Sequence, residues 1–342
     1  MAQSGSGDER VVAMRHGWTV WRRRWSRRQW LSVGAAAAAL LLVGGVGGFV
    51  LLRGPAQDTV DHYRVLAGIA DRRVLRIGVF ADEPLMAYRD PTKPNSTQIE
   101  DYAGFDIELA RNLGRYLGFD EASLVLRPTE VQNRAQDLSE GRVDIIIASY
   151  SMTRQREDEV DFAGPYLMTK PEVLMRAAEA PQRITFNQLR ERRRPMCTTG
   201  SSTSEDALRS RGITNVDGVA TANECVEGLL RKKYDAFVLD RTVLAGFQET
   251  RPGLRIVDLV FGQSESLGIA VEDGNEALRT LVNNFLFDSY ERGVHGAWAR
   301  AWQVTFAKVI KEETRQPRPR GVTVRLRDYN DRYKDGRQAG SP

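Results

Sequence analysis

The sequence predicts an α/β fold of two lobes that follows a membrane-spanning helix. Three observations support this prediction. Between about residues 73 and 311, apolar β-branched runs alternate with helical patterns, which is typical of layered α/β folds with mainly parallel sheets. The uncharged stretch 31–52 precedes that region. At two segments, 170–172 and 262–268, the chain is expected to cross from one lobe to the other. Two crossings that lie side by side form a hinge about which the lobes can close on a ligand.

The first 30 residues are basic, with seven arginines against Asp8 and Glu9. As a helix, residues 31–52 would span roughly 33 Å, which is enough to cross a bilayer. Arginines and interleaved tryptophans on the amino side predict that residues 1–30 form a cytoplasmic tail, with the remaining chain outside the cell. A cleaved signal peptide is the alternative, but residues 53–55 follow without an Ala-x-Ala site.

The net charge of +4 is unevenly distributed along the chain. Residues 1–30 carry +5 and residues 312–342 carry +3, so residues 31–311 carry −4. A nucleic-acid-binding domain should carry its basic patch on the fold itself, so we expect no nucleic-acid partner. Residues 312–342 combine mixed charge with the Pro-containing run 316–320, and we predict that they form a disordered tail.

These patterns divide the chain into successive segments. Residues 53–72 read as a juxtamembrane helix or linker, whose apolar positions recur at helical spacing. Residues 73–168 together with 266–311 are predicted to form lobe 1, and residues 171–262 lobe 2.

The segment 143–166 is the most informative stretch of the chain. Ile145-Ile146-Ile147 predicts a strand covered on both faces. Ser149, Ser151 and Thr153 follow at its carboxyl end, where open α/β sheets bind their ligands. Arg156 comes next, and an arginine beside free backbone N–H groups suits a small carboxylate. Alternatively, Ser151 and Thr153 only cap a helix and Arg156 is a solvated surface charge.

Five further blocks accompany this segment. Taken together with it, in their order and spacing, they resemble the family 3 extracellular solute-binding proteins. The blocks are 75–84, 102–110, 197–205, 224–227 and 234–246. These proteins are the amino-acid receptors of ABC importers, and the glutamate/glutamine-type receptors of high-GC Gram-positive bacteria are the most similar. The resemblance runs from about Val74 to about Phe306. It implies a two-lobed, periplasmic-binding-protein-like (type II) clamp without a cofactor.

The resemblance also implies roles for individual residues. An amino acid presents a carboxylate, an ammonium group and a side chain. Arg156 is the candidate for the carboxylate, because it matches the family's Thr/Ser-x-Thr-x-x-Arg pattern. The backbone N–H groups of Ser149 and Ser151 and the Ser151 hydroxyl are expected to assist it. Asp240 is the candidate for the ammonium group, with a plain helix cap as the alternative. Asp82 either supports the ammonium group or the hinge, or is only a turn residue.

Recognition of the ligand side chain is expected to fall to lobe 2, with Arg134 of lobe 1 as a further candidate. Ser202 and Thr203 stand at a predicted helix start, where hydroxyl and N–H groups suit a distal carboxylate or amide. The plain alternative is a capping sequence. The glycine spacing here departs from the family, so the contact could fall on either residue. Arg134 could pair with a side-chain carboxylate, which would favour glutamate or aspartate, or with an acid on its own helix, Asp137 or Glu130.

Cys197 and Cys225 are the two cysteines of the chain. In an extracellular domain a disulfide between them is the natural interpretation, and two buried free thiols are the alternative. The family resemblance supports the bridge. The cysteines form no CxxC pair and the three histidines are scattered, so we expect no metal site.

Three functions compete. The first is a membrane-tethered receptor for a polar amino acid of the glutamate, glutamine, aspartate and asparagine class, serving an ABC permease. The second is a sensor that signals through a membrane or cytoplasmic partner. The third is an enzyme on the same fold, which we do not expect because the sequence offers no Ser-His-Asp set or nucleophile elbow.

Overall fold

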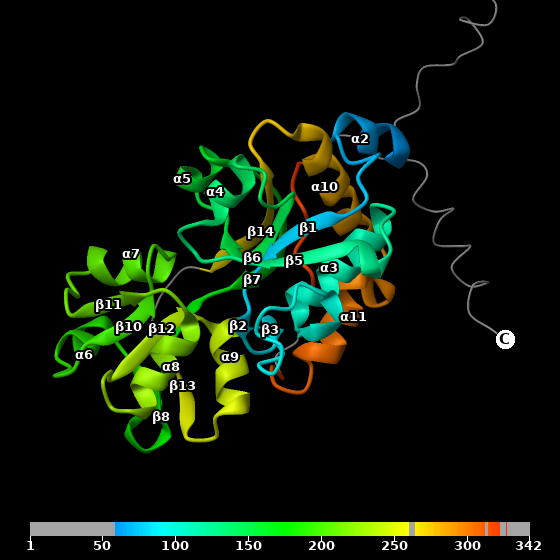
Figure 1. Ribbon diagram of the computed structural model, residues 1–342. Helices are drawn as coiled ribbons and strands as arrows, with labels where there is room; N and C mark the ends of the chain where they lie inside the picture. The colour runs from blue at the N-terminus through cyan, green and yellow to red at the C-terminus, as the bar shows by residue number, and fades with distance from the viewer. Residues whose placement is uncertain (1–58, 260–263, 312–313, 322–325, 327–342) are drawn as a thin grey trace, which may run out of the picture. The chain divides into compact units, whose positions relative to one another are not determined.

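The computed structural model describes residues 59–259, 264–311, 314–321 and 326. Two main β-sheets define lobe 1 and lobe 2 (Figure 1). The lobe 1 sheet has the order β5-β1-β6-β14-β7, with strands β1 (Leu75–Val79), β5 (Leu124–Pro128), β6 (Ile145–Ser151), β7 (Val160–Thr169) and β14 (Glu265–Glu272). The lobe 2 sheet has the order β11-β10-β12-β8-β13-β9, with strands β8 (Pro171–Arg176), β9 (Arg183–Ile184), β10 (Met196–Thr199), β11 (Val216–Val219), β12 (Ala236–Asp240) and β13 (Leu254–Leu259).

Helices surround each sheet. Those of lobe 1 are α2 (Val60–Leu66), α3 (Phe105–Tyr116), α4 (Arg134–Ser139), α5 (Arg154–Glu157), α10 (Glu276–Glu291) and α11 (Ala297–Thr305). Those of lobe 2 are α6 (Phe186–Arg190), α7 (Thr203–Ser210), α8 (Ala222–Leu230) and α9 (Arg241–Thr250). A small sheet of lobe 1 contains β2 (Asp82–Glu83), β3 (Ala87–Arg89) and β4 (Tyr102–Ala103), and single-turn 3-10 helices occupy Ile99–Asp101, Glu121–Ser123, Ala177–Glu179 and Gly293–His295.

Strand β6 is the centre of lobe 1. Every residue of it is buried, because β1 pairs with it on one side, β14 pairs with it on the other, and α3 and α4 pack against it. This environment is the one that the β-branched run Ile145-Ile146-Ile147 predicts. The result is a rigid strand whose carboxyl end delivers Ser149 and Ser151 to the edge of the sheet.

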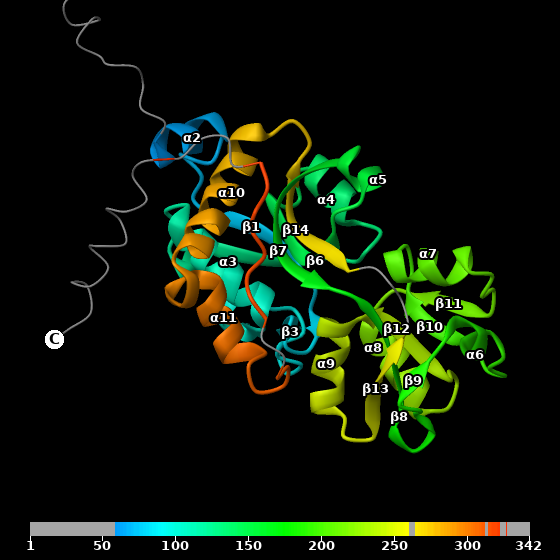
Figure 2. The same ribbon diagram turned by 180° about the vertical axis from the view of Figure 1, so that it is seen from behind.

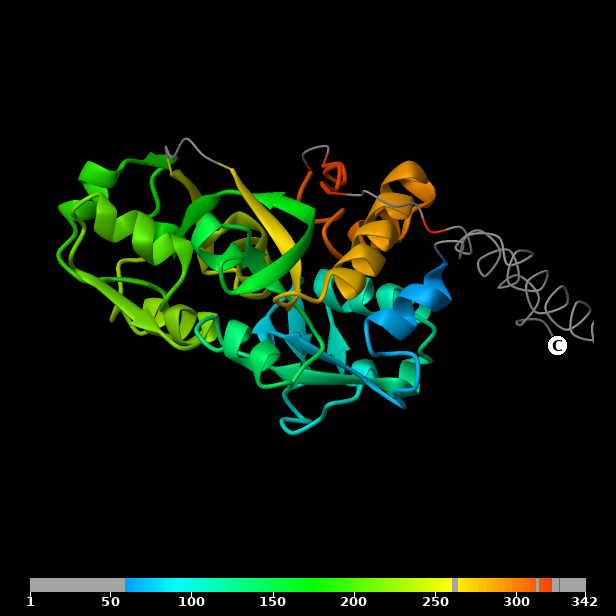
Figure 3. The ribbon, with the colours of Figure 1, turned by 90° about the horizontal axis from the view of Figure 1, so that it is seen from above.

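The chain passes between the lobes twice. Lys170 separates β7 from β8, and residues 260–264, of which 260–263 lie outside the described residues, separate β13 from β14. Figure 3 shows β7 and β14 running side by side, and their pairing is antiparallel. The prediction of mainly parallel sheets is therefore wrong in part, since β14 is antiparallel to both neighbours and β8 is antiparallel to β12 and β13. One crossing leaves lobe 1 and the other returns to it, so the crossing strands must run in opposite directions.

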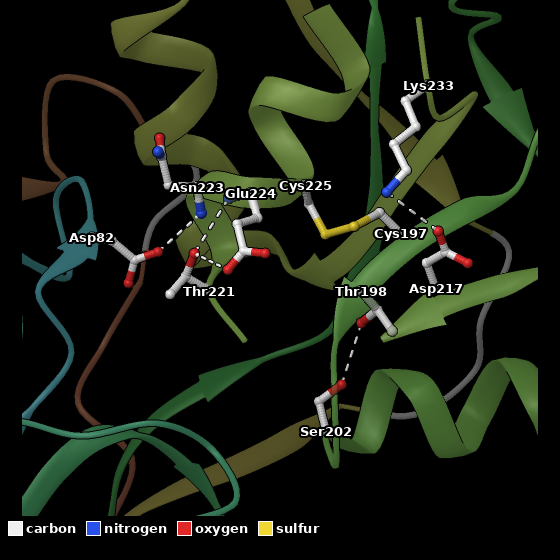
Figure 4. The surroundings of a disulfide bond; sticks show 10 residues. All are labelled: Asp82, Cys197, Thr198, Ser202, Asp217, Thr221, Asn223, Glu224, Cys225 and Lys233. Atoms are coloured by element: carbon white, nitrogen blue, oxygen red, sulfur yellow. Dashed lines mark hydrogen bonds and ion pairs between the residues drawn. A yellow bond between two sulfur atoms is a disulfide. The ribbon is translucent and has the colours of Figure 1, made fainter. Parts of the chain in front are cut away.

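The predicted disulfide is confirmed. Cys197 lies in β10 and Cys225 on α8, with Cα atoms 5.4 Å apart, within the usual range for a disulfide (Figure 4). Both cysteines are fully buried. The bond therefore ties helix α8 to the strand that leads toward the start of α7.

The ends of the described chain pack on lobe 1. Helix α2 packs against α10, and its Val60 is buried, whereas its Leu66 is 58% exposed. Residues 314–321 depart from the predicted disordered tail. Gln316 bonds to Ser289 Oγ and to the Leu286 carbonyl, and the Arg320 N–H donates to the Gly164 carbonyl of β7. Figure 2 shows this segment, in red, passing along lobe 1. These backbone and amide hydrogen bonds are contacts that charge composition does not reveal.

No helix within the described part of the chain is long and apolar enough to span a membrane. The predicted span, residues 31–52, and the basic segment 1–30 lie outside the described residues.

Candidate functional site

A cavity with an empty volume of about 330 Å³ lies between the two lobes. Lobe 1 lines it with Phe80, Glu83, Val131, Arg134, Ser149, Ser151 and Arg156. Lobe 2 lines it with Thr199, Ser202, Thr203, Leu239, Asp240 and Val243. Seven of the eight predicted ligand-binding residues are therefore brought together in one cavity, and Asp82 is the exception.

Arg156 is held in place by the turn that follows β6. Thr153 caps α5 by accepting a hydrogen bond from the Arg156 N–H, and the guanidinium lies 5.1 Å from the centre of the Tyr150 ring. Its Nη1 donates to the Ser151 carbonyl at 3.0 Å, and its Nη2 donates to the Ser201 carbonyl of lobe 2 at 3.2 Å. A guanidinium has five N–H donors, so these two bonds leave donors that can face a carboxylate. Thus Arg156 is not simply a solvated surface charge.

Asp240 ends β12 and is deeply buried. It stands at the N-cap position of α9, yet its side chain makes no capping hydrogen bond, so the plain helix-cap interpretation is wrong. Its Oδ1 is buried without any hydrogen-bond partner. Burial, followed by the nearby Glu265 charge, raises the pKa of Asp240 well above its usual value. A buried carboxylate oxygen without a partner is costly, and an incoming ammonium group would satisfy it.

Arg134 is almost fully buried at the base of the cavity. Nε donates to the Val131 carbonyl and Nη1 to the Ala148 carbonyl, while the guanidinium stacks 3.8 Å from the centre of the Tyr150 ring. Burial lowers the pKa of Arg134 to about 9. The predicted alternative of an ion pair on its own helix is wrong, because Asp137 bonds instead to Thr129 and Arg142.

Ser149 lines the cavity but its backbone does not serve as predicted. Its N–H donates to Asp106 Oδ2 at 3.3 Å and its hydroxyl donates to Glu83 Oε2 at 3.2 Å. The backbone here adopts a positive φ of 42°, which turns the N–H toward Asp106. Asp106 also accepts from the Tyr166 hydroxyl, and burial raises the pKa of this carboxyl to about 7. Asp106 thus fixes the strand end, and we assign Ser149 no backbone contact with a ligand.

Glu83 is a cavity residue that the sequence argument missed. It is 3% exposed, and burial together with the charges of Asp82 and Asp106 raises its pKa well above the usual value. A protonated carboxyl both donates and accepts hydrogen bonds, so Glu83 can recognise a polar side chain. Neighbouring residues of a strand point to opposite faces. Sequence alone could not decide whether Asp82 or Glu83 faces the ligand.

Asp82 points away from the cavity and toward lobe 2. Its Oδ2 accepts a hydrogen bond from the backbone N–H of Asn223 at 2.9 Å, in the first turn of α8 (Figure 4). Negative charge is stabilised at a helix N-terminus. Of the predicted roles, the contact fits support of the hinge, because it joins the two lobes.

Ser202 and Thr203, at the start of α7, have different hydrogen-bond partners. Ser202 is the N-cap, accepting from the Glu205 N–H at 3.1 Å, and its hydroxyl lies 3.3 Å from that of Thr198 (Figure 4). The Thr203 hydroxyl instead faces lobe 1, 3.5 Å from the Ser151 hydroxyl. Glu265, which the sequence argument did not single out, accepts hydrogen bonds from both Ser151 and Thr203.

Within the described ranges no group of three or more His, Cys, Asp and Glu side chains could hold a metal ion. The cavity offers hydrogen bonding and charge: the buried guanidinium of Arg134, the half-buried one of Arg156, hydroxyls from both lobes, and the carboxyls of Glu83 and Asp240. Opposite charges on facing walls suit a zwitterion.

Several curated proteins are similar to this chain in sequence. The glutamate-binding protein GluB of Corynebacterium efficiens is 28% identical over 242 residues, covering 68% of this chain and 76% of that protein. The glutamine-binding protein GlnH of Bacillus subtilis is 24% identical over 237 residues, covering 69% and 84%. A cyclohexadienyl dehydratase of Pseudomonas aeruginosa is 27% identical over 165 residues, covering 47% and 58%.

Solved structures share the fold. The receptor for L-cysteine of Neisseria gonorrhoeae superposes with a TM-score of 0.65 at 24% identity, covering 74% of this chain and 99% of that one. The family model of the bacterial extracellular solute-binding proteins, family 3, matches residues 75–305. This match includes the cavity residues of both lobes. The chain therefore belongs to the bacterial extracellular solute-binding proteins, family 3.

Proposed function

We propose that this protein binds a polar α-amino acid outside the cell and delivers it to an ABC-type permease. The observation that supports it most directly is the pair of facing charges: Arg156 on lobe 1 and the unpartnered Oδ1 of Asp240 on lobe 2. The carboxylate of the ligand would bond to Arg156 and its ammonium group to Asp240. Both bonds form only when the lobes are together, so ligand binding would stabilise closure.

The side chain of the ligand would lie toward Glu83 and Arg134. Arg134 offers hydrogen-bond donors, and a protonated Glu83 offers both a donor and an acceptor. An amide or carboxyl side chain fits this pair, as in glutamine, glutamate, asparagine or aspartate. The names of the glutamate- and glutamine-binding relatives support the same class.

Membrane tethering is the second part of the proposal. The uncharged residues 31–52 would anchor the protein as a single-pass helix, with residues 1–30 in the cytoplasm. Such an anchor keeps the receptor near its permease. Fractionation of cells should place the full-length protein in the membrane pellet, and recovery from the soluble fraction would contradict the anchor.

The dehydratase relative makes catalysis the competing possibility. We propose binding without conversion. The bound amino acid should be recovered unchanged after prolonged incubation with the protein, as judged by NMR of the released ligand. A new product that appears in proportion to protein concentration would identify an enzyme instead.

The test of binding is a titration of full-length protein, purified in mild detergent, with each proteinogenic amino acid by calorimetry. Arg156→Ala should weaken binding by roughly a hundredfold, because it removes one partner of a buried charged contact. Arg154→Ala is the matched control: this arginine is exposed on the same short helix, and its loss should leave affinity unchanged. Equal affinities of Arg156→Ala and unsubstituted protein would overturn the carboxylate assignment.

A further inference from the structure

Glu265 occupies an unusual place at the second crossing between the lobes. It is the first residue of β14, opposite Thr169 at the end of β7. Its Oε2 lies 2.6 Å from the Ser151 hydroxyl of lobe 1 and 2.7 Å from the Thr203 hydroxyl of lobe 2. A single carboxylate oxygen therefore joins both lobes at the edge of the cavity. We call this contact the Glu265 bridge.

The Glu265 bridge uses the hydroxyl protons of Ser151 and Thr203, and this limits the hydrogen bonds that the two hydroxyls can donate to a ligand. A serine or threonine hydroxyl carries one proton and can donate one hydrogen bond. Both protons are directed at Glu265, so Ser151 and Thr203 present only acceptor lone pairs to the cavity. A carboxylate also has only acceptors. While the bridge persists, a ligand carboxylate cannot receive hydrogen bonds from either hydroxyl.

We propose that Glu265 is an intramolecular competitor of the ligand carboxylate, a role that rests on the proposed function. In the absence of ligand, its carboxylate takes the hydroxyl donors of Ser151 and Thr203 and holds the two lobes in a closed arrangement that excludes the ligand carboxylate. An incoming amino acid displaces it, and Ser151 and Thr203 then donate to the ligand carboxylate beside Arg156. Glu265 thereby sets the affinity, because part of the binding free energy goes into breaking the bridge.

The charge pattern supports displacement over joint binding. Asp240 already offers a buried acceptor for the ammonium group, and Glu265 is close enough to contribute to the raised pKa of Asp240. A ligand carboxylate placed at the same hydroxyls would lie beside the Glu265 carboxylate, and like charges at short range repel. If Glu265 instead bound the ammonium group together with Asp240, its removal would weaken binding. The two roles thus predict affinity changes of opposite sign.

The experiment compares full-length Glu265→Ala and Glu265→Gln with the unsubstituted protein. Glu272→Ala is the matched control, since it removes the same charge from the exposed far end of the same strand. We expect Glu265→Ala to lower the Kd for the amino acid by about tenfold, as removal of a competing state does. Glu265→Gln, which keeps an acceptor oxygen but loses the charge, should have a smaller effect of the same sign. A Kd that rises or stays the same in both variants overturns the proposal.

A measurement without ligand separates this proposal from the proposed function. Hydrogen exchange of the amides of residues 201–206 should become about fivefold faster in ligand-free Glu265→Ala, because the start of α7 loses its tie to lobe 1. Unchanged exchange in both Glu265 variants would show that the bridge does not hold the lobes. If exchange accelerates but no protein binds any amino acid, the proposed function fails while the bridge between lobes stands.

Discussion

Asp240 is the residue to which the proposed function assigns the ligand ammonium group. Its carboxyl is buried, one oxygen has no partner, and its pKa is raised by burial. Arg134 and Arg156 oppose that rise but do not cancel it. At the residue scale, the raised pKa makes the Asp240 carboxyl easier to protonate than usual, and a ligand ammonium group beside it would favour the ionised form.

Binding should release a proton at any pH at which Asp240 is protonated in the free protein. The ammonium group favours the ionised form of Asp240, so the affinity should increase as pH rises toward the raised pKa of Asp240 and level off above it. Calorimetry in two buffers with different ionisation enthalpies, at several pH values between about 5 and 8, measures the number of protons released. Proton uptake, or affinity that falls with rising pH over this range, would contradict the ammonium assignment.

At the scale of elements, the carboxyl ends of strands carry several of the residues that line the cavity. β6 delivers Ser149 and Ser151, β12 delivers Asp240, and β10 leads into the N-terminus of α7, where Thr203 lies. Ligands of open α/β folds bind at such strand ends. The disulfide between Cys197 in β10 and Cys225 in α8 fixes the strand that precedes α7.

Reduction of this disulfide should destabilise lobe 2. The two cysteines are 28 residues apart, and closing a loop of that length contributes about 3–4 kcal/mol in the chain-entropy model. Urea unfolding of oxidised and reduced full-length protein should differ by an amount of this order. The chain has two cysteines, so reduction affects this bond alone. Identical unfolding midpoints would show that packing of α8, and not the bond, holds this part of lobe 2.

At the scale of the whole ligand-binding unit, closure depends on contacts that only the two lobes together create. Asp82 meets the first turn of α8, Arg156 reaches the Ser201 carbonyl, and Gly246 of α9 faces Pro84 of lobe 1. A Cβ atom on Gly246 would lie 1.7 Å from the Pro84 carbonyl oxygen. No side chain can be accommodated there without moving one lobe relative to the other.

Gly246→Ala should therefore weaken ligand binding by at least about tenfold while lobe 2 itself remains stable, since alanine favours helices by about 0.5–1 kcal/mol over glycine. The Kd and the urea midpoint without ligand report these two effects separately. Gly253→Ala is the matched control, because its Cβ would meet nothing within 4 Å. Unchanged affinity in Gly246→Ala would mean that the ligand-bound lobes do not approach as closely as in this structure.

Much of the element-scale organisation could be predicted from the sequence. The buried β6, the crossing at Lys170 and the disulfide all follow from local patterns or from family resemblance. The antiparallel pairing of β8 with β12 and β13 could not be predicted, because it depends on how segments distant in sequence assemble the lobe 2 sheet. The packed residues 314–321 were also missed, since their hydrogen bonds go to partners distant in sequence.

The sequence by itself determined the family and the two-lobed α/β fold, and it indicated Arg156 and Asp240 as candidates for a charged ligand, because residue type and spacing encode strand ends and charges. Only the tertiary structure decided that Glu83, and not Asp82, faces the cavity. It also decided the hydrogen-bond partners of Ser149 and Arg134 and the contact of Glu265 with both lobes. These outcomes depend on distances between atoms far apart along the chain. Local sequence constrains such distances weakly, whereas the packing of the two lobes fixes them.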